Sequence, residues 1–169
     1  QENEFYNSLM ALGEAKGNYH KQQLVPFGES IPHLFVPLMQ WLGLPVVNTI
    51  SGDNQQAPIT VFNQAIASLI CYELAYPERL RHQLPQGQWI VSISDDGWFG
   101  HSLALHQHLQ MAQILSLMAQ RDHVFVNNNG LSSLINAQGE IISQLPAWQK
   151  EQLVGKIHPH QSITPWMSW

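Results

Sequence analysis

Three stretches of the chain carry side chains that together could form a covalent intermediate with an acyl or nitrile substrate. Cys71 is the only cysteine and ends an apolar run. Lys21 and Glu29 belong to a Pro- and Gly-containing stretch, and residues 95–100 form the loop sequence DDGWFG. A thiol becomes an effective nucleophile when a base or a cation activates it, and the negative charge that develops on the attacked group needs a cation or N–H donors. These residue types therefore indicate nucleophilic catalysis by a cysteine.

Each of these residues also has a simpler interpretation. Free cysteines are among the most buried residue types and usually only pack. An isolated lysine such as Lys21 is usually a solvated surface group. Glu29, which follows a Pro-Phe-Gly sequence, could equally accept structural hydrogen bonds. Residue types and positions leave both interpretations open.

Histidines close to the DDGWFG loop are the only further candidates for metal ligands. His106 and His108 would lie on different faces of a helix, because helical neighbours are three or four residues apart. No cysteine or carboxylate next to His101, His106 and His108 completes a ligand set. We expect surface or hydrogen-bonded core histidines here, with no metal and no cofactor.

Composition excludes several classes of protein. Only 11% of the residues are charged, against about 25% in an average globular protein. The net charge of -5 and the seven Lys and Arg residues argue against nucleic-acid binding. No signal peptide is visible, and no apolar run approaches the ~20 residues of a transmembrane helix. The chain is long enough for one domain, and we expect it to be a fragment of a longer protein.

The pattern of apolar and polar residues predicts an α/β fold with mixed sheets. Strands alternate with helices first, and later strands in the chain are paired by hairpins. Ser102 is a candidate cap for the longest helix. The expected elements are a strand in 4–12 leading to a turn, a hairpin over 59–71 ending in a buried strand, a helix starting at 77–81, a buried strand at 89–94, a helix over 102–120, and short strands at 124–126, 133–135 and 140–142 with a hairpin turn at 136–139.

Residues 33–47 form an apolar segment that contains Trp41 and is interrupted by prolines. The segment is too short to span a bilayer. It could lie at a membrane interface, but core packing is the commoner fate of such segments. Core packing is therefore the expectation for this segment.

Four motifs, in order and spacing, resemble the carbon–nitrogen hydrolase (nitrilase) superfamily, and within it the apolipoprotein N-acyltransferase family. They are YHKQQLVPFGE at 19–29, ICYE at 70–73, DGWFG at 96–100 and NNG at 128–130. The resemblance extends over essentially the whole chain. It departs at Asp95, where the family usually has asparagine, and at uncharged residues where the family often has charged ones, namely Gln113, Leu115, Met118 and Phe125.

The resemblance implies a nitrilase-like α-β-β-α sandwich, of which residues 1–169 would be an incomplete domain lacking its N-terminal part. It also implies a Glu-Lys-Cys mechanism in which Cys71 is the nucleophile and Lys21 stabilises the oxyanion. The backbone N–H of Tyr72 would be a second oxyanion donor, and Glu29 would assist Lys21 or proton transfer. The resemblance begins at the segment FYNS at 5–8. The general-base glutamate would precede this chain, because Glu2 and Glu4 lie too close to that segment to match it.

The loop and the residue after Tyr72 would complete the substrate site. Trp98 and Phe99 would line an acyl-chain pocket or its entrance. An equal alternative is that both residues only pack against the rest of the protein. Glu73 is expected to bind substrate. Asp95 and Asp96 are expected to accept hydrogen bonds from backbone N–H groups of their loop rather than to act as paired catalytic carboxylates.

The function implied is transfer of an acyl chain from a phospholipid, through a cysteine thioester, to the N-terminal amine of a diacylglyceryl-cysteine lipoprotein. The expected partners are therefore the phospholipid donor, the lipoprotein acceptor and a membrane surface. The expected location is the periplasmic face of the bacterial inner membrane. Two alternatives stay open: a soluble amidase or nitrilase with water as acceptor, and a non-catalytic fragment that lacks the base.

Overall fold

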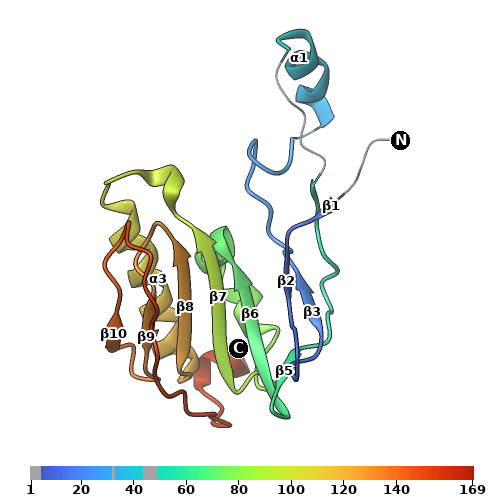
Figure 1. Cartoon of the computed structure of the whole chain (residues 1–169). Helices are drawn as coiled ribbons and strands as arrows, with labels where there is room; N and C mark the ends of the chain where they lie inside the picture. Colours follow the sequence, from blue (N-terminus) through green and yellow to red (C-terminus); the bar gives the residue numbers. More distant parts are fainter. Residues whose placement is uncertain (1–4, 32, 44–48) are drawn as a thin grey trace.

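The computed structural model describes residues 5–31, 33–43 and 49–169, and its centre is a six-stranded mixed sheet (Figure 1). The strands are β1 (Phe5–Tyr6), β2 (Ser8–Met10), β3 (Asn18–His20), β4 (Thr49–Ile50), β5 (Ile59–Val61), β6 (Gln64–Ile70), β7 (Trp89–Asp95), β8 (His123–Asn128), β9 (Ser133–Ile135) and β10 (Ile141–Gln144). The helices are α1 (Val36–Trp41), α2 (Pro77–Arg81) and α3 (Ala104–Ala119), and the 3₁₀ turns are η1 (His33–Phe35), η2 (Cys71–Ala75), η3 (Gly97–Phe99) and η4 (Pro165–Ser168).

The order of strands in the large sheet is β10-β9-β8-β7-β6-β5. β6, β7 and β8 run parallel, and β5, β9 and β10 pair antiparallel with their neighbours. Helix α2 lies on the connection from β6 to β7, and α3 on the connection from β7 to β8, as parallel strands require. The carboxyl ends of the three parallel strands therefore meet at one edge of the sheet, where Cys71 follows β6 and the DDGWFG loop ends β7.

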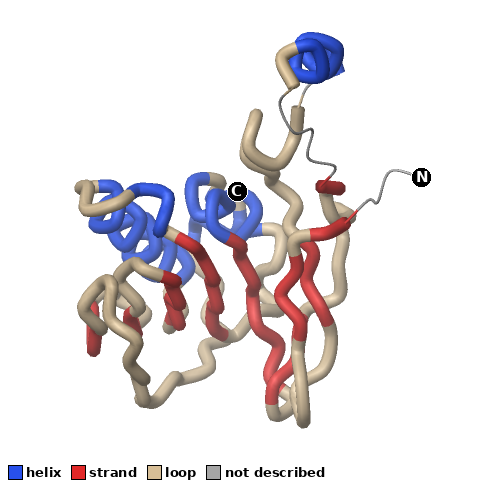
Figure 2. The backbone as a smooth tube through the Cα atoms, turned by 45° about the horizontal axis from the view of Figure 1, so that its top comes forward, coloured by secondary structure: helices blue, strands red, loops and turns tan. Residues whose placement is uncertain are grey.

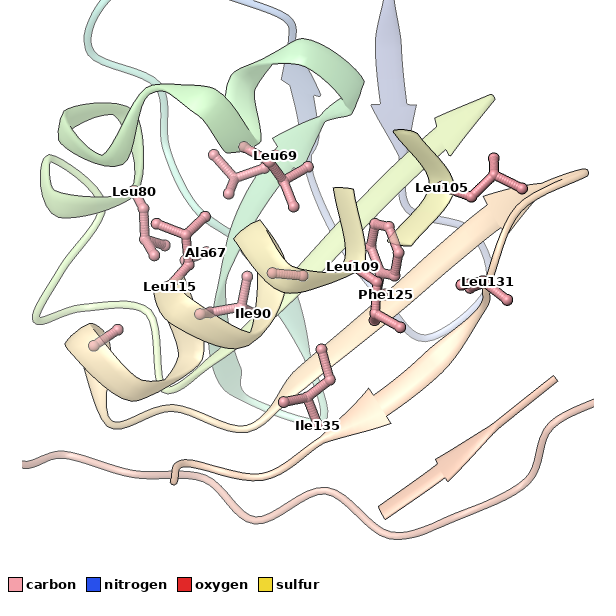
Figure 3. Close-up of a cluster of buried hydrophobic side chains, with 13 residues drawn as sticks. Ala67, Leu69, Leu80, Ile90, Leu105, Leu109, Leu115, Phe125, Leu131 and Ile135 are labelled. Atoms are coloured by element: carbon pink, nitrogen blue, oxygen red, sulfur yellow. The ribbon is translucent and has the colours of Figure 1, made fainter. Parts of the chain in front are cut away.

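Helices α2 and α3 pack together on one face of this sheet (Figure 2). Because side chains alternate along a strand, Ala67 and Leu69 of β6, Ile90 of β7 and Phe125 of β8 all enter this helix-covered core. Figure 3 shows Leu105, Leu109 and Leu115 of α3 in the same cluster. This burial holds the carboxyl ends of β6 and β7 rigidly in place.

A two-stranded antiparallel ribbon, β2 and β3, packs at the β5–β6 side of the sheet. Tyr19 of β3 shares a buried cluster with Ile59, Ile66 and Ile70, and Lys16 pairs with Thr60 of β5. The ribbon thereby brings the residue that follows β3, Lys21, to the edge at which β6 ends.

The strands predicted after residue 58, the hairpin over 59–71, the helix at 77–81 and the mixed α/β class are confirmed. The single strand predicted in 4–12 is instead two short strands, β1 and β2, in different sheets. The long helix is shorter than predicted, and Ser102 Oγ accepts a hydrogen bond from Ala104 N at 3.3 Å while Leu103 occupies the cap position. The turn at 136–139 closes with Gly139 N donating to Asn136 O at 2.9 Å. No helix among the described residues is long and apolar enough to cross a membrane.

The expectation that residues 33–47 pack in the core is wrong for the described part of that segment, and residues 44–47 lie outside the described residues. Figure 1 shows α1 extended away from the sheet. Leu34 is 84% exposed and Trp41 81% exposed. Leu38 and Leu42 are also exposed. Within the described residues, Phe35 of this segment packs edge-on against Phe27, with ring centroids 5.6 Å apart.

Candidate active site

Six of the residues singled out from the sequence surround one cavity of about 660 Å³ at the carboxyl edge of the sheet: Lys21, Glu29, Cys71, Asp95, Trp98 and Phe99. The exposed lining as a whole is mainly apolar and includes Val25, Ile70 and Ile93, while Asn7 and Ser94 add polar groups. A second hollow of about 760 Å³ is lined mostly by polar side chains and contains none of these six residues. The smaller, apolar cavity is therefore the candidate active site.

Cys71 sits where β6 gives way to the 3₁₀ turn η2. Its φ angle of 52° lies in the left-handed region, which costs an L-residue about 1 to 2 kcal/mol. The residue is half-buried and lines the cavity. A sharp strand-to-helix turn of this kind presents a nucleophile at the top of a sheet on a rigid backbone.

Lys21 is only 1% exposed, so its interpretation as a solvated lysine is excluded. Its Nζ donates to both carboxylate oxygens of Glu29, at 2.8 and 2.6 Å. Glu29 also accepts hydrogen bonds from Asn7 Nδ2 at 2.6 Å and from Val25 N at 2.8 Å. The buried cation is thus paired with a carboxylate that is itself fixed by two further donors. Asn7 lies in one of the segments that resemble the family, but its type alone did not indicate this contact.

The backbone around Lys21 is equally fixed. Lys21 N donates to Asn7 O, and Gly52 N donates to Lys21 O, both at 2.8 Å. A Cβ atom at Gly52 would overlap the carbonyl oxygen of His20. Glycine at this position therefore allows the chain to approach closely enough to hold the lysine.

Glu73 lies behind the cavity rather than on its wall. Its side chain is fully buried, and Oε1 accepts hydrogen bonds from Tyr19 Oη, Gln22 N and Gln23 N, while Oε2 accepts one from Ile70 N. Burial raises the pKa of Glu73, and these donors offset part of that rise. The carboxylate therefore ties the loop of Lys21 to the end of β6, and the structure does not bring it together with the other predicted substrate-binding residues.

Tyr72 is likewise not among the residues that line the cavity. Its ring packs edge-on against Tyr76, with centroids 5.1 Å apart, and its hydroxyl accepts a hydrogen bond from Tyr76 at 3.0 Å. The role predicted for Tyr72 belongs to its backbone N–H, which lies in the first turn of η2. N–H groups in the first turn of a helix have no intrahelical acceptor. No helix carbonyl therefore competes with a substrate oxyanion for this N–H.

The DDGWFG loop forms η3 and the opposite wall of the cavity. Asp95 accepts a hydrogen bond from Gly97 N at 2.9 Å, which confirms its predicted structural role. Trp98 is 89% exposed and Phe99 about half exposed, so neither is buried in a core. Gly100 has a φ of 56° and ψ of -150°, a conformation that an L-residue rarely adopts.

Comparison with known proteins decides the family of the chain. Residues 1–165 match the profile of the carbon-nitrogen hydrolase family. The chain belongs to the carbon–nitrogen hydrolase family. Its resemblance to apolipoprotein N-acyltransferases is also confirmed: it is 38% identical to the protein of that name from Pseudomonas syringae pv. tomato over 98% of the chain, and 37% identical to that from Coxiella burnetii over 99%. It covers 33% and 35% of those two proteins, so the chain spans about a third of their length.

Solved structures of the superfamily share the fold at low sequence identity. An amidase from Nesterenkonia AN1 is 13% identical, with a TM-score of 0.53 over 78% of this chain and 47% of the amidase. A carbon–nitrogen hydrolase from Helicobacter pylori G27 is 16% identical, with a TM-score of 0.55 over 76% of this chain and 47% of that protein. The nitrilase-like fold class predicted from the sequence is therefore confirmed.

In this family member, a buried polar group connects the DDGWFG loop to helix α3. Asp96 is fully buried and accepts hydrogen bonds from Ser94 Oγ at 2.9 Å and from Asn127 Nδ2. It also lies 2.8 Å from Nδ1 of His108, whose Nε2 lies 3.3 Å from the carbonyl oxygen of Cys71. Burial would raise the pKa of Asp96, but its contacts with His108, Ser94 and Asn127 outweigh burial and lower it.

These contacts change the interpretation of two residues. Asp96 was expected to accept backbone N–H groups of its own loop, but its described partners are the side chains of Ser94, His108 and Asn127. His108 was a weak candidate for a metal ligand, and it is instead a hydrogen-bonded core residue. Among residues 5–31, 33–43 and 49–169, no group of three or more His, Cys, Asp or Glu side chains is arranged to hold a metal ion.

Proposed function

We propose that this chain carries the nucleophile and the oxyanion-stabilising lysine of an N-acyltransferase that moves an acyl chain from a phospholipid to the N-terminal amine of a diacylglyceryl-cysteine lipoprotein. The observation that carries the proposal is the single apolar cavity shared by Cys71, Lys21 and Glu29. The names of the relatives, which the chain covers by about a third, support the same class of reaction.

In the first half-reaction, the sulfur of Cys71 forms a bond to the carbonyl carbon of a phospholipid ester. Lys21 Nζ and the N–H of Tyr72 stabilise the negative oxygen of the tetrahedral intermediate, since fixed donors in an apolar site act more strongly than in water. The bond to the glycerol oxygen then breaks. That oxygen takes the proton that a carboxylate base had removed from the thiol, and a thioester on Cys71 results.

In the second half-reaction, the lipoprotein amine attacks the thioester carbonyl, and the carbon–sulfur bond breaks. The base accepts the proton of the attacking amine and passes it to the departing sulfur. Glu29 has a different task, because its two oxygens are bound to Lys21: it orients the lysine. The resemblance to the family implies that the base is a further glutamate, and we propose that it lies outside residues 1–169.

The walls of the cavity favour an acyl chain over a polar substrate. Trp98 and Phe99 stand at its rim on the exposed DDGWFG loop, and Val25, Ile70 and Ile93 extend the apolar surface inward. Apolar groups in these positions would bind the hydrocarbon of the donor and lower the water concentration around the thioester. Exclusion of water favours transfer to an amine over hydrolysis.

The segment 33–43 supports action at a membrane surface. Its exposed apolar side chains would bury their surface in the interfacial region of a bilayer, and its contact with Phe27 joins it to the loop that carries Glu29. We propose that this segment contacts the bilayer that supplies the phospholipid, and that the domain works at the periplasmic face of the bacterial inner membrane.

Exchange of Trp41 and Leu42 for aspartate in the full-length protein is expected to weaken binding to phospholipid vesicles and to slow acyl transfer by about tenfold, because both side chains are largely exposed. Vesicle co-sedimentation and initial rates measure the two effects. Exchange of Phe62 and Val154, which are also exposed apolar residues, for aspartate is the matched control. Unchanged vesicle binding and unchanged rates in the Trp41 and Leu42 variant would exclude the proposed contact.

The reaction itself is tested by trapping the acyl-enzyme. Full-length protein incubated with phospholipid and no acceptor is expected to gain the mass of one acyl chain on the peptide that contains Cys71, and to lose it when a diacylglyceryl-cysteine peptide is added. In Lys21→Met the adduct should form at least about a hundredfold more slowly, because the oxyanion loses its cation. Equal labelling in Lys21→Met would contradict the role of the lysine.

The same measurement separates the alternatives. Release of free fatty acid in place of the N-acylated peptide would indicate a hydrolase that uses water. Absence of any adduct on Cys71, while acceptor becomes acylated, would overturn the thioester mechanism. Absence of both adduct and product would indicate a non-catalytic protein.

A further inference from the structure

His108 occupies an unusual position near the start of α3. Its side chain is nearly buried, and its ring lies edge-on to Phe99 and Phe125, with centroids 6.5 and 5.5 Å away. Each ring nitrogen lies within hydrogen-bonding distance of an oxygen: Nδ1 is 2.8 Å from Asp96 Oδ1, and Nε2 is 3.3 Å from the carbonyl oxygen of Cys71. One imidazole therefore connects a buried carboxylate to the backbone of the candidate nucleophile.

The chemistry of the two partners determines the protonation state that this geometry requires. A carbonyl oxygen only accepts hydrogen bonds, and so does an ionised carboxylate. A neutral imidazole has a single N–H and could satisfy only one of them. Both contacts are made together only when His108 carries protons on both nitrogens, as an imidazolium.

The surroundings of Asp96 favour this charged form. Asp96 is fully buried, and its other described side-chain donors, Ser94 and Asn127, are neutral. A buried carboxylate is costly without a compensating charge. A cationic His108 supplies that charge.

Other titratable groups on the elements around His108 are engaged elsewhere. On η2, the carboxylate of Glu73 is directed to Tyr19 and Ile70. On β8, the ring of His123 packs against the ring of Phe125, with centroids 6.2 Å apart. Burial lowers the pKa of His123 to about 4. On the DDGWFG loop, Asp95 is turned to Gly97 N. Asp96 is thus the carboxylate that holds His108.

We propose that His108 is a positioning residue: as an imidazolium held by Asp96, it donates a hydrogen bond to the carbonyl of Cys71 and so fixes the left-handed turn that presents the thiol. The inference rests on the proposed role of Cys71 as nucleophile. It has two consequences. The turn at Cys71, with its φ of 52°, is supported by a side chain from outside its own segment. A positive charge in contact with the backbone of Cys71 also favours the thiolate.

The first experiment measures the reactivity of Cys71 in the full-length protein. The protein is alkylated with iodoacetamide over a series of pH values, and the peptide containing Cys71 is quantified by mass spectrometry. In His108→Gln the rate at neutral pH is expected to fall about tenfold and the whole pH profile to move to higher pH, since loss of a neighbouring cation disfavours the thiolate. His106→Gln, an exposed histidine on the same helix, is the matched control. A His108→Gln profile that coincides with the control overturns the inference.

A second measurement needs no variant and so does not depend on the stability of one. Nitrogen NMR of ¹⁵N-histidine-labelled full-length protein distinguishes protonated from unprotonated ring nitrogens. Both nitrogens of His108 are expected to be protonated at neutral pH, and an unprotonated nitrogen overturns the inference. Both measurements are independent of acyl transfer. If the protein transfers no acyl chain, they still decide the state of His108, and if it does transfer one, a normal alkylation profile in His108→Gln rejects this inference alone.

Discussion

Exchange of Cys71 for alanine is expected to lower acyl transfer by at least about a thousandfold, the scale seen when a covalent nucleophile is removed. The reaction would lose its thioester, and the Lys21–Glu29 pair and the apolar walls of the cavity have no other described thiol to act on. The variant should fold normally. Alanine and cysteine are both L-residues, so the cost of the left-handed φ at position 71 is the same for both.

Initial rates of acceptor acylation by the full-length protein measure this effect, and thermal unfolding checks the fold. Ile93→Val removes one methylene from the same cavity wall and serves as the control, with a rate expected within about threefold of the unmodified protein. A Cys71→Ala protein that keeps a tenth or more of the activity would show that another group is acylated.

Exchange of Glu73 for glutamine is expected to cost about 3 kcal/mol of unfolding free energy. Four donors converge on the two oxygens of Glu73: Tyr19 Oη, Gln22 N and Gln23 N on Oε1, and Ile70 N on Oε2. A glutamine keeps one oxygen and places an NH₂ group against at least one buried N–H. Each buried polar group left without a partner costs about 1 to 3 kcal/mol. Burial of the Glu73 carboxylate raises its pKa, so removing the charge recovers part of the lost unfolding free energy.

Urea denaturation measures the change, and Glu78→Gln is its matched control. Glu78 is exposed in the first turn of α2, and its exchange should change the unfolding free energy by no more than about 0.5 kcal/mol. Acyl transfer should also fall in Glu73→Gln, because Glu73 holds the loop of Lys21 against the strand of Cys71. If Glu73→Gln instead unfolds like the control and only raises KM, Glu73 is the substrate contact that the motif ICYE suggested.

Local patterns predicted most of the elements correctly. Alternation and apolar runs located β6 and β7, helical spacing located α3, and the Asn136–Gly139 sequence located a hairpin turn. These features depend on residues that are close in the chain. The described part of the apolar segment, residues 33–43, was misjudged because composition records how apolar a segment is but not whether another surface is available to cover it.

The residue types of the candidate site were determined by the sequence itself. One cysteine after an apolar strand, a lysine and a glutamate in the 19–29 stretch and the DDGWFG loop were compatible with nucleophilic catalysis. The motifs were enough to identify the family, and the resemblance implied the role of each residue. This was possible because chemistry depends on functional groups, which a sequence lists directly.

Only the tertiary structure decided how those groups are held. Lys21 is buried against Glu29, and Cys71 lies in a left-handed turn. Glu73 binds backbone N–H groups behind the cavity, and His108 connects Asp96 to Cys71. These contacts connect residues far apart in the chain. They depend on the register of β6, β7 and β8, on the crossover through α3 and on the packing of the β2–β3 ribbon, and no local pattern of residues contains that information.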